Sequence, residues 1–316
     1  MSLAPQAHFG IMADMRNLKI AVIGLGNMGK YHVKHSQTIP GAELVAICDT
    51  DPERVRLAQE TAAGVPGFTS IASMLAAVTV DLACVVVPTF LHAKIAGELL
   101  CHGVHVLVEK PIASTIQEAE SLIQIAIENK KRLFVGHVEY FNPATQAFFN
   151  HIKTNSFGQI YQICARRWSP MPMQITDANV IIDLCIHDLH IVAQLIAESP
   201  THTTWHSKSH VLDNRADAAT GILHFPTAMA CIDANWVSSA KVRDMEIVAQ
   251  NGVAKIDLLN QRLFISSPSQ PEWTETAITK AWPLETELTH VLHAIRTGDP
   301  SPIDAKEGLR ALQFCS

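Results

Sequence analysis

The stretch KIAVIGLGNMGKYH, residues 19–32, decides the fold. Its first part is an apolar run typical of a buried β-strand, and a helix-forming segment follows after three glycines. Gly24 permits a tight turn, Gly26 lets a pyrophosphate approach the backbone, and Gly29 allows the helix to pack closely on the strand. The N-terminus of that helix offers free N–H groups and a positive dipole end to phosphates. The stretch therefore predicts a dinucleotide-binding unit; the alternative is a glycine-rich turn that binds no ligand.

A second strand-like segment, ELVAICD (residues 43–49), supplies the acid that such a unit needs. Asp49 at its end suits the hydroxyls of an adenosine ribose and repels a 2′-phosphate. We therefore expect NAD and regard NADP as the weaker alternative, which Arg54 nearby keeps open. The predicted cofactor-binding residues are Gly24, Leu25, Gly26, Asn27, Met28, Gly29, Asp49, Arg54, Thr89, His92, Glu109 and Lys110.

Strand-like and helical segments continue to alternate up to about residue 138. They cover residues 81–88, 88–103, 105–111, 114–130 and 132–138. This alternation predicts a doubly wound α/β domain whose ligand lies at the carboxyl ends of parallel strands. We place this cofactor-binding Rossmann domain at residues 18–138, after a flexible extension at residues 1–17.

Lys110 stands at one of these strand ends, directly before a proline. A residue in that position is biased away from the helical conformation, so Lys110 should stay at the rim where a nicotinamide would lie. The alternative is a solvated surface lysine.

The alternation stops after residue 138, and strand-like segments become dominant. They cover residues 159–169, 219–239, 244–259 and 262–267, and the pair Asn251-Gly252 is typical of a tight hairpin turn. We predict a substrate-binding and oligomerisation α+β domain at residues 139–316, with a large, mostly antiparallel sheet. A helix at about 284–297 and the helix described next should pack against one face of it. The other face would need cover, which predicts a homodimer or homotetramer formed through this sheet.

The segment VIIDLCIHDLHIV, residues 180–192, is mostly apolar but carries two acids and two histidines. At ~100° per residue of a helix, Asp183, His187, His190 and Gln194 share one narrow stripe. A polar stripe on an otherwise apolar helix must face a buried hydrogen-bonded network or a cleft. Asp183, His187 and His190 also have the spacing of metal ligands, but no further ligand cluster is evident, and we expect no metal.

The composition excludes several classes of protein. The chain has 316 residues, 48% hydrophobic and 17% charged, with a net charge of −6 and no long basic run, so we expect no nucleic-acid partner. No apolar run reaches the ~20 residues that span a bilayer, and the N-terminus does not have the pattern of a signal peptide. The seven cysteines form no CxxC pair. These features predict a cytoplasmic protein of about two domains with no membrane partner.

Taken together, the motifs resemble the Gfo/Idh/MocA family of oxidoreductases, from residue 19 to about residue 312. The segments that carry the resemblance are VIGLGNMG, VVVPTFLH, VEKP, GHVEYFNPA and DLCIHDLH. EKP together with a downstream DxxxH is the specific combination. Within the family, GHVEYFNPA, ARRWSPMP and NWVSSAKVR are most similar to UDP-N-acetylglucosamine 3-dehydrogenases, which oxidise a sugar hydroxyl to a ketone with NAD. The chain ends at ALQFCS, where the resemblance leads us to expect the continuation of another helix.

The resemblance implies that Lys110, Asp183 and His187 contact the hydroxyl that is oxidised. His187 would accept its proton, Lys110 would stabilise the developing alkoxide, and Asp183 would orient the histidine or bind a sugar hydroxyl. The family pattern usually has aspartate where this chain has His190, and relatives of the 3-dehydrogenase type carry arginine where it has Tyr140. The predicted substrate-binding residues are His137, Tyr140, Asn142, Arg166, Arg167, Asp183, His187 and His190.

Arg166 and Arg167 are candidates for binding a nucleotide diphosphate. Consecutive residues on a strand point to opposite faces, so at most one of them should reach the cleft. The alternative is a structural ion pair or an oligomer contact.

We therefore expect an NAD-dependent dehydrogenase that transfers a hydride from a secondary hydroxyl of a sugar, a UDP-N-acetyl sugar in particular, to the nicotinamide. Three alternatives remain open from the sequence. They are a polyol or inositol dehydrogenase, a non-catalytic sugar sensor that binds NAD in the same fold, and an internal histidine network without catalysis.

Overall fold

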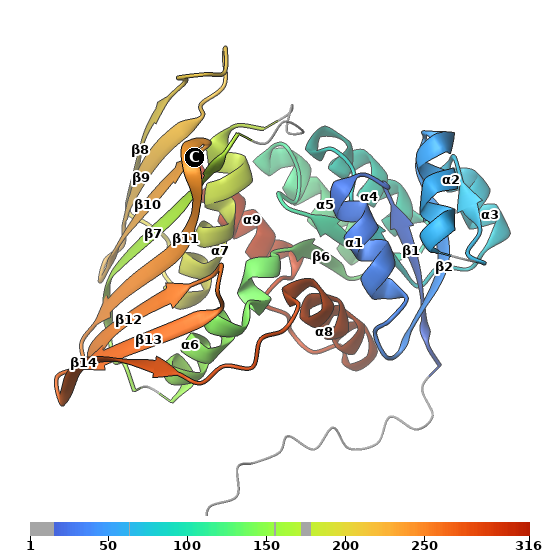
Figure 1. Cartoon of the computed structure of the whole chain (residues 1–316). Helices are drawn as coiled ribbons and strands as arrows, with labels where there is room; N and C mark the ends of the chain where they lie inside the picture. The colour runs from blue at the N-terminus through green and yellow to red at the C-terminus, as the bar shows by residue number, and fades with distance from the viewer. Residues whose placement is uncertain (1–15, 63, 155, 172–177) are drawn as a thin grey trace, which may run out of the picture.

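The computed structural model describes residues 16–62, 64–154, 156–171 and 178–316, which form two parts that pack side by side (Figure 1). The extension predicted at residues 1–17 lies outside the described residues except for its last two positions. None of the described helices is both long and apolar enough to cross a membrane.

The first part is a six-stranded parallel sheet with the strand order β3-β2-β1-β4-β5-β6. Its strands are β1 (Leu18–Ile23), β2 (Ala42–Cys48), β3 (Gly67–Phe68), β4 (Leu82–Val85), β5 (His105–Glu109) and β6 (Leu133–Gly136). The order reverses between β1 and β4, so the loops at the carboxyl ends of these strands flank a crevice. This confirms the predicted doubly wound domain.

Helices cover both faces of this sheet. They are α1 (Asn27–Ser36), α2 (Pro52–Thr61), α3 (Ile71–Ala77), α4 (His92–Cys101) and α5 (Ile116–Glu128), with the 3₁₀ turn η1 (Thr89–Leu91) before α4. Alternate residues of β1 define the two faces. Ile20 and Val22 share a core with Val33 of α1, whereas Ala21 and Ile23 share the other core with α4 and α5.

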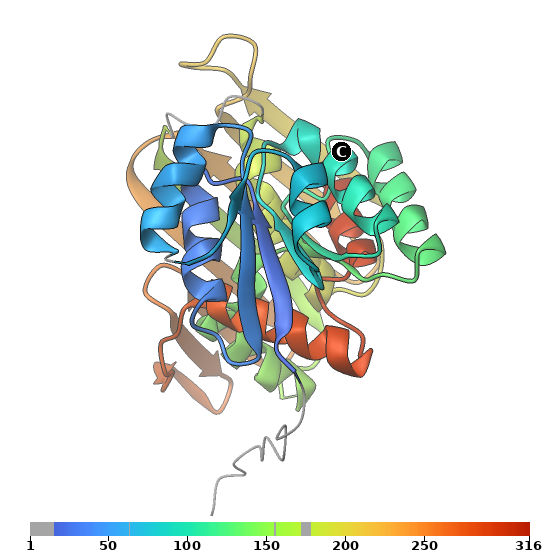
Figure 2. The same ribbon diagram turned by 90° about the vertical axis from the view of Figure 1, so that its right-hand side faces the viewer.

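Helix α8 (Pro283–Thr297), the helix predicted at about 284–297, also belongs to this part. Leu288 and Leu292 lie in the same core as Ile20 and Val22 of β1, and Figure 2 shows α8 in orange-red across the lower ends of the blue strands. The prediction that this helix packs against the antiparallel sheet was wrong. Its apolar stripe indicates burial, but an apolar stripe does not specify which sheet it covers.

The second part is an eight-stranded sheet in the order β14-β13-β12-β11-β7-β10-β9-β8. Its strands are β7 (Ile160–Pro170), β8 (His202–Lys208), β9 (Ala218–His224), β10 (Met229–Asn235), β11 (Val237–Ala249), β12 (Gly252–Asp257), β13 (Arg262–Ser267) and β14 (Gln270–Thr276). Only the β7–β10 pair is parallel among the pairs of these strands, which confirms a mostly antiparallel sheet.

The hairpins agree with the sequence in their main features. The predicted hairpin joins β11 to β12, but its two turn residues are Gln250 and Asn251, one position earlier than predicted, because Ala249 pairs with Gly252, the first residue of β12. The long second strand predicted within residues 219–239 is divided, since β10 ends at Asn235 and β11 begins at Val237. The predicted strands did not include β8 and β14.

Helices α6 (Pro143–Lys153) and α7 (Ile186–Leu195) lie on the face of the second sheet that is turned to the first part (Figure 1). Phe148 of α6 and Leu189 of α7 share one core with Ile163 and Ile247 of the sheet. No described helix covers the opposite face (Figure 1), and the homo-oligomer through this sheet stays a prediction.

Residues 180–196 form two kinds of helix in succession. A π-helical turn, η3 (Ile181–Cys185), continues directly into α7. The sequence predicted α-helical spacing throughout, and the π turn is therefore a correction. Single π turns are often found at functional sites, and this one carries Asp183.

The two parts meet along α7. The last helix, α9 (Ala305–Gln313), packs between α7 of the second part and α5 and β6 of the first. Its Arg310 donates hydrogen bonds to the carbonyl oxygens of Ala193, Ile196, Ala197 and Glu198 at the end of α7. The polar residues of η3 and α7 are thus fixed relative to the first sheet.

Candidate active site

The glycine loop between β1 and α1 has the shape that a dinucleotide requires. Gly24 has φ +93°, which glycine adopts without a steric penalty, and a Cβ there would clash with the carbonyl oxygen of Val86. A Cβ at Gly29 would clash with the carbonyl of Gly24, so α1 packs directly on the turn. A Cβ at Gly26, by contrast, would meet no described atom within 4 Å. The backbone is therefore open to a phosphate at Gly26.

The start of α1 completes this surface. The helix begins at Asn27, and its first turn, which includes Met28, contains no acidic residue. The positive end of the helix dipole is thus not neutralised from within the helix and suits a pyrophosphate.

Asp49, directly after β2, stabilises the glycine loop through a hydrogen bond. Its Oδ2 accepts a hydrogen bond from the backbone N–H of Leu25 at 2.8 Å, and its Oδ1 accepts one from the N–H of Asp51 at 3.0 Å. Arg54 Nη1 lies 3.8 Å from Asp49 Oδ2. The sequence predicted a ribose contact for Asp49, and the structure adds a role in holding the glycine loop.

The remaining predicted cofactor residues lie at the carboxyl ends of β4 and β5. Thr89 begins η1. The buried ring of His92 lies 2.8 Å from the carbonyl oxygen of Pro111 and 2.9 Å from that of Val87, so it joins the two strand-end loops.

Glu109 lies at the end of β5, 2.9 Å from His32 Nε2 of α1. Burial alone would raise the pKa of Glu109, but the hydrogen bond with His32 and the charge of Lys110 outweigh it and lower the pKa. The carboxylate therefore ties α1 to the lysine-bearing loop.

Lys110 contacts the π turn of the other part of the molecule. Its Nζ donates to Asp183 Oδ1 at 2.7 Å and to the Asp183 carbonyl oxygen at 2.9 Å. The two side chains are only 16% and 15% exposed. The structure thus brings together two of the three residues predicted to act on the substrate, beside the carboxyl end of β5.

His187, the third of these residues, follows on the first turn of α7 and is partly exposed. Its Nδ1 is buried and has no hydrogen-bond partner among the described residues. Burial lowers the pKa of His187 well below 6.5, and the positive charges of Lys110, Arg167 and Arg243 lower it further. The imidazole is therefore neutral near pH 7 and can accept a proton.

His137 and His190 form a stacked pair, with ring centroids 4.0 Å apart and an angle of 2° between the rings. His190 Nε2 donates to the carbonyl oxygen of Pro302 at 2.8 Å, and burial lowers the pKa of His190 to about 4. Burial, followed by the neighbouring His190 and Lys110, lowers the pKa of His137 well below 6.5. The ring of Tyr140 packs edge-on against His190 at 5.8 Å. These three predicted substrate residues form a neutral, closely packed group near Lys110 in which both histidines are buried, and their contact with a substrate stays a prediction.

Asn142 has a structural role in this geometry. It is buried, and its side chain caps α6 by accepting from the N–H of Ala144 while donating to the carbonyl oxygen of Leu258. These contacts engage the side chain within the protein, which does not support its predicted role as a substrate ligand.

The structure engages both consecutive arginines in ion pairs. Arg167 is 1% exposed, and its guanidinium binds Asp188 at 2.7 and 2.9 Å and Glu139 at 2.9 Å. Arg166 points to the opposite face of the sheet, where it forms two hydrogen bonds with Asp244. Neither guanidinium, as placed, is free for a substrate phosphate. Both form structural ion pairs, which the sequence left open as the alternative to phosphate binding.

Arg243 is the arginine that the sequence predictions missed. It lies on β11 directly opposite Arg167 of β7. Its Nη1 is 3.2 Å from Glu139 Oε1, and the side chain is 38% exposed. It ends the segment NWVSSAKVR that carries the family resemblance, but only the strand pairing shows that it lies opposite Arg167.

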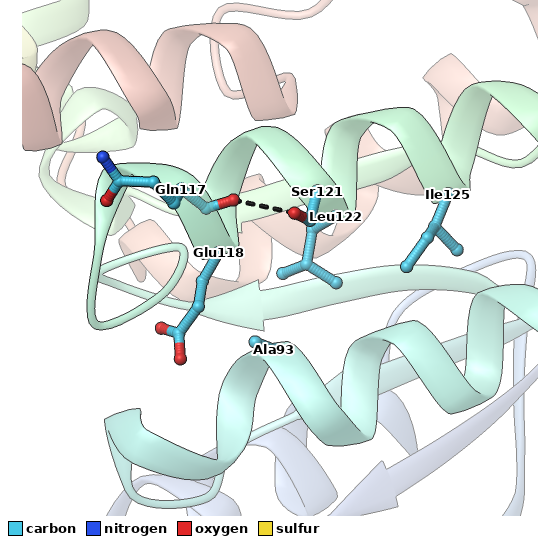
Figure 3. A pocket seen from close by; sticks show the side chains of 6 residues that line it. All are labelled: Ala93, Gln117, Glu118, Ser121, Leu122 and Ile125. Carbon is cyan, nitrogen blue, oxygen red and sulfur yellow. Dashed lines mark hydrogen bonds between the residues drawn. The ribbon is translucent and has the colours of Figure 1, made fainter.

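A depression on the surface between α4 and α5 is separate from the site formed by Lys110, Asp183 and His187 (Figure 3). It is lined by Ala93, Gln117, Glu118, Ser121, Leu122 and Ile125. Glu118 belongs there to the capping box at the start of α5, and none of the predicted site residues lines the depression. Within the described ranges, no group of three or more histidine, cysteine, aspartate or glutamate side chains is arranged to hold a metal ion.

Comparison with known proteins places this site in a family. Residues 18–137 match the oxidoreductase family with the NAD-binding Rossmann fold, Gfo/Idh/MocA, and residues 146–255 match the Gfo/Idh/MocA C-terminal domain. The chain is 31% identical to a UDP-N-acetylglucosamine 3-dehydrogenase from Acidithiobacillus ferrooxidans, over 94% of this chain and 95% of that protein. It is 28% identical to an inositol 2-dehydrogenase from an Arthrobacter species, over 58% of this chain and 56% of that protein.

Solved structures show the same likeness. The crystal structure of the Acidithiobacillus ferrooxidans UDP-N-acetylglucosamine 3-dehydrogenase matches with a TM-score of 0.88 and 29% identity, over 95% of this chain and 96% of that one. The WlbA dehydrogenase from Bordetella pertussis, solved with NADH and UDP-GlcNAcA, shares the fold with a TM-score of 0.79 at 22% identity, over 95% of each chain. The glycine loop, the Lys110–Asp183 contact and these matches over both parts of the molecule show that the chain belongs to the Gfo/Idh/MocA family of NAD-binding oxidoreductases.

Proposed function

We propose that this protein is an NAD-dependent dehydrogenase that oxidises a secondary hydroxyl of a UDP-N-acetyl sugar to a ketone. The observation that carries the proposal is the contact between Lys110 and Asp183, one turn before His187, at the edge of the crevice beside the glycine loop. The choice of a nucleotide sugar rests on the likeness to the UDP-N-acetylglucosamine 3-dehydrogenase, which extends over nearly the whole of both chains.

The residues of the first part fit NAD. The open backbone at Gly26 and the start of α1 would hold the pyrophosphate, and Asp49 would face the adenosine ribose. Bound NAD supplies the acceptor for the hydride that leaves the carbinol carbon. Lys110 stands at the end of β5, on the side of the crevice where the nicotinamide of such a cofactor lies in this fold.

The chain's own residues handle the proton. His187 is neutral, so it can take the hydroxyl proton while the carbon–oxygen bond becomes double and the hydride departs. The ammonium of Lys110 would donate a hydrogen bond to the same oxygen and stabilise its developing negative charge. Asp183 holds that ammonium with its carboxylate and its carbonyl oxygen, and so positions it before the substrate binds.

A polyol dehydrogenase is the second candidate, because inositol 2-dehydrogenases are also among the relatives. The two candidates differ in the need for a nucleotide diphosphate on the substrate. The test is NADH formation, followed by absorbance, with NAD and either UDP-N-acetylglucosamine or myo-inositol. NADH from UDP-N-acetylglucosamine supports the proposal, and NADH from inositol alone would replace it with the second candidate. NAD binding without NADH from any sugar or nucleotide sugar would indicate a sensor.

A further inference from the structure

We infer that Arg243 binds a phosphate attached to the sugar ring of the substrate, close to the hydroxyl that is oxidised. This inference rests on the proposed function, since it assumes a nucleotide-sugar substrate. Arg243 takes the role for which the sequence suggested Arg166 or Arg167.

The strand register puts Arg243 on the side of the sheet that carries the site. Arg243 of β11 is paired with Arg167 of β7, and the side chains of paired residues lie on the same face. The Arg167 guanidinium binds Asp188 of α7, the residue after His187. The side chains of Arg243 and His187 therefore belong to the same layer, between the second sheet and the first part of the molecule.

Arg243 retains hydrogen-bonding capacity that Arg167 has used. A guanidinium has five N–H donors. Arg167 is almost wholly buried and uses Nε, Nη1 and Nη2 on two carboxylates. Arg243 makes one side-chain hydrogen bond among the described residues, from Nη1 to Glu139, and its side chain is 38% exposed. Its other nitrogens remain for a ligand, and paired guanidinium donors match phosphate oxygens.

Arg243 is also held less tightly than Arg167. Glu139 Oε1 is shared, with Arg167 at 2.9 Å and Arg243 at the longer distance of 3.2 Å. Arg243 can therefore turn toward a phosphate without leaving the buried Glu139 unpaired, because Arg167 stays bound to that carboxylate.

The contacts of Arg243 limit which phosphate this is. Arg243 shares Glu139 with Arg167, and Arg167 also binds Asp188, the residue directly after His187. A group bound there lies beside the reacting hydroxyl, not at the far end of a nucleotide. The phosphate on the anomeric carbon of the sugar meets this condition.

The test compares Arg243→Ala with wild type and with Arg166→Ala. Arg166→Ala is a matched control because it removes an arginine from the neighbouring residue pair of the same two strands, β7 and β11, on the opposite face. The substrates are UDP-N-acetylglucosamine, N-acetylglucosamine 1-phosphate and N-acetylglucosamine. Arg243→Ala should raise KM for both phosphate-bearing substrates about tenfold to a hundredfold, as the loss of a charge-assisted pair of hydrogen bonds implies. It should leave kcat/KM for N-acetylglucosamine and the Kd for NAD within about twofold, and Arg166→Ala should leave all of these unchanged.

Each outcome bears on a separate claim. Wild-type protein that forms no NADH from UDP-N-acetylglucosamine overturns the proposed function. Wild-type activity together with an unchanged KM in Arg243→Ala overturns only the assignment of Arg243. If Arg243→Ala loses NAD binding because it misfolds, Arg243→Lys replaces it. This variant keeps a positive charge beside Glu139 but not the paired donors, so its KM for UDP-N-acetylglucosamine should still rise, and an unchanged value would overturn the assignment.

Discussion

Lys110 Nζ lies 2.7 Å from Asp183 Oδ1, although the two residues are 73 positions apart in the chain. The lysine comes from the end of a parallel strand and the aspartate from a π turn in the other part of the molecule. Both side chains are largely buried, so the surrounding protein fixes their positions. A positioned ammonium at the edge of a cofactor crevice can stabilise charge as it develops on a substrate oxygen.

Lys110→Ala should lower kcat by about a hundredfold to a thousandfold, the usual effect of removing one donor that acts on a developing oxyanion. The Kd for NAD should change little, because the pyrophosphate site lies at the glycine loop. Steady-state kinetics and calorimetric titration with NAD measure the two effects. Lys94→Ala, an exposed lysine on α4, is the control. A kcat equal to that of the wild type would remove Lys110 from the chemistry.

His187 should give a pH–rate profile that differs from that of an ordinary histidine base. Burial, then Lys110 and the arginines, lower the pKa of His187 well below 6.5. The base is therefore already deprotonated near neutral pH, and kcat/KM should fall only as the pH drops through this lowered pKa. A histidine with the ordinary pKa of ~6.5 would give a pH dependence near neutrality, and the buried environment of His187 moves it to lower pH. His187→Ala should lose most of the turnover and the acidic limb of the profile.

The control for this experiment is His102→Ala, an exposed histidine at the end of α4. It should keep both the rate and the profile of the wild type. An acidic limb centred near ~6.5, the ordinary value for histidine, would show that His187 is more solvated than in this structure.

The features that the sequence predicted well are those with local causes. The turn at Gly24 and the packing at Gly29 follow from the steric requirements of a few adjacent residues. The hairpin near Asn251 was also predicted, with its turn one position too late. Lys110 was singled out because a strand end and a proline define its place locally. A general likeness to the family then connected it to Asp183, which the structure places 2.7 Å away.

The features that the sequence could not supply depend on distant parts of the chain. The alternation of Arg166 and Arg167 was expected, but the partners that bury Arg167 come from η2 (Val138–Phe141) and α7. Arg243 ends the segment NWVSSAKVR, but its register opposite Arg167 could not be read from the sequence. The π turn at Asp183 was not predicted, because apolar periodicity over a single turn does not distinguish a π-helix from an α-helix.

The cofactor preference can be tested at Asp49. We expect the wild type to bind NAD at least about tenfold more tightly than NADP, because the carboxylate would face the 2′-phosphate with like charge. Asp49→Asn removes the charge but keeps an oxygen that can accept from the N–H of Leu25. It also releases Arg54, which lies 3.8 Å from Asp49. The variant should therefore bind NADP more tightly than the wild type does, by calorimetric titration.

Glu53→Gln is the control for Asp49→Asn, since Glu53 is an exposed acid of α2 that pairs with Arg56. It changes the net charge equally and should leave the ratio of the two Kd values unchanged. Equal binding of NAD and NADP by the wild type would show that Arg54 determines the preference and not Asp49.

Arg167 should contribute to the stability of the fold and not to substrate binding. Arg167→Met keeps an apolar stem but leaves the carboxylates of Asp188 and Glu139 buried. Among the described residues, Glu139 then keeps the ion pair with Arg243 and the hydrogen bond from Asn142. Removing one partner of a buried ion pair costs about 3–5 kcal/mol of the free energy of unfolding, whereas Arg166→Met, which breaks a partly exposed pair, should cost about 1 kcal/mol or less. Urea denaturation measures both values.

The double variant Arg167→Met/Asp188→Leu should recover part of the loss, because no unpaired carboxylate of Asp188 then remains. A stable Arg167→Met variant with a raised KM for UDP-N-acetylglucosamine would instead make Arg167 a substrate ligand.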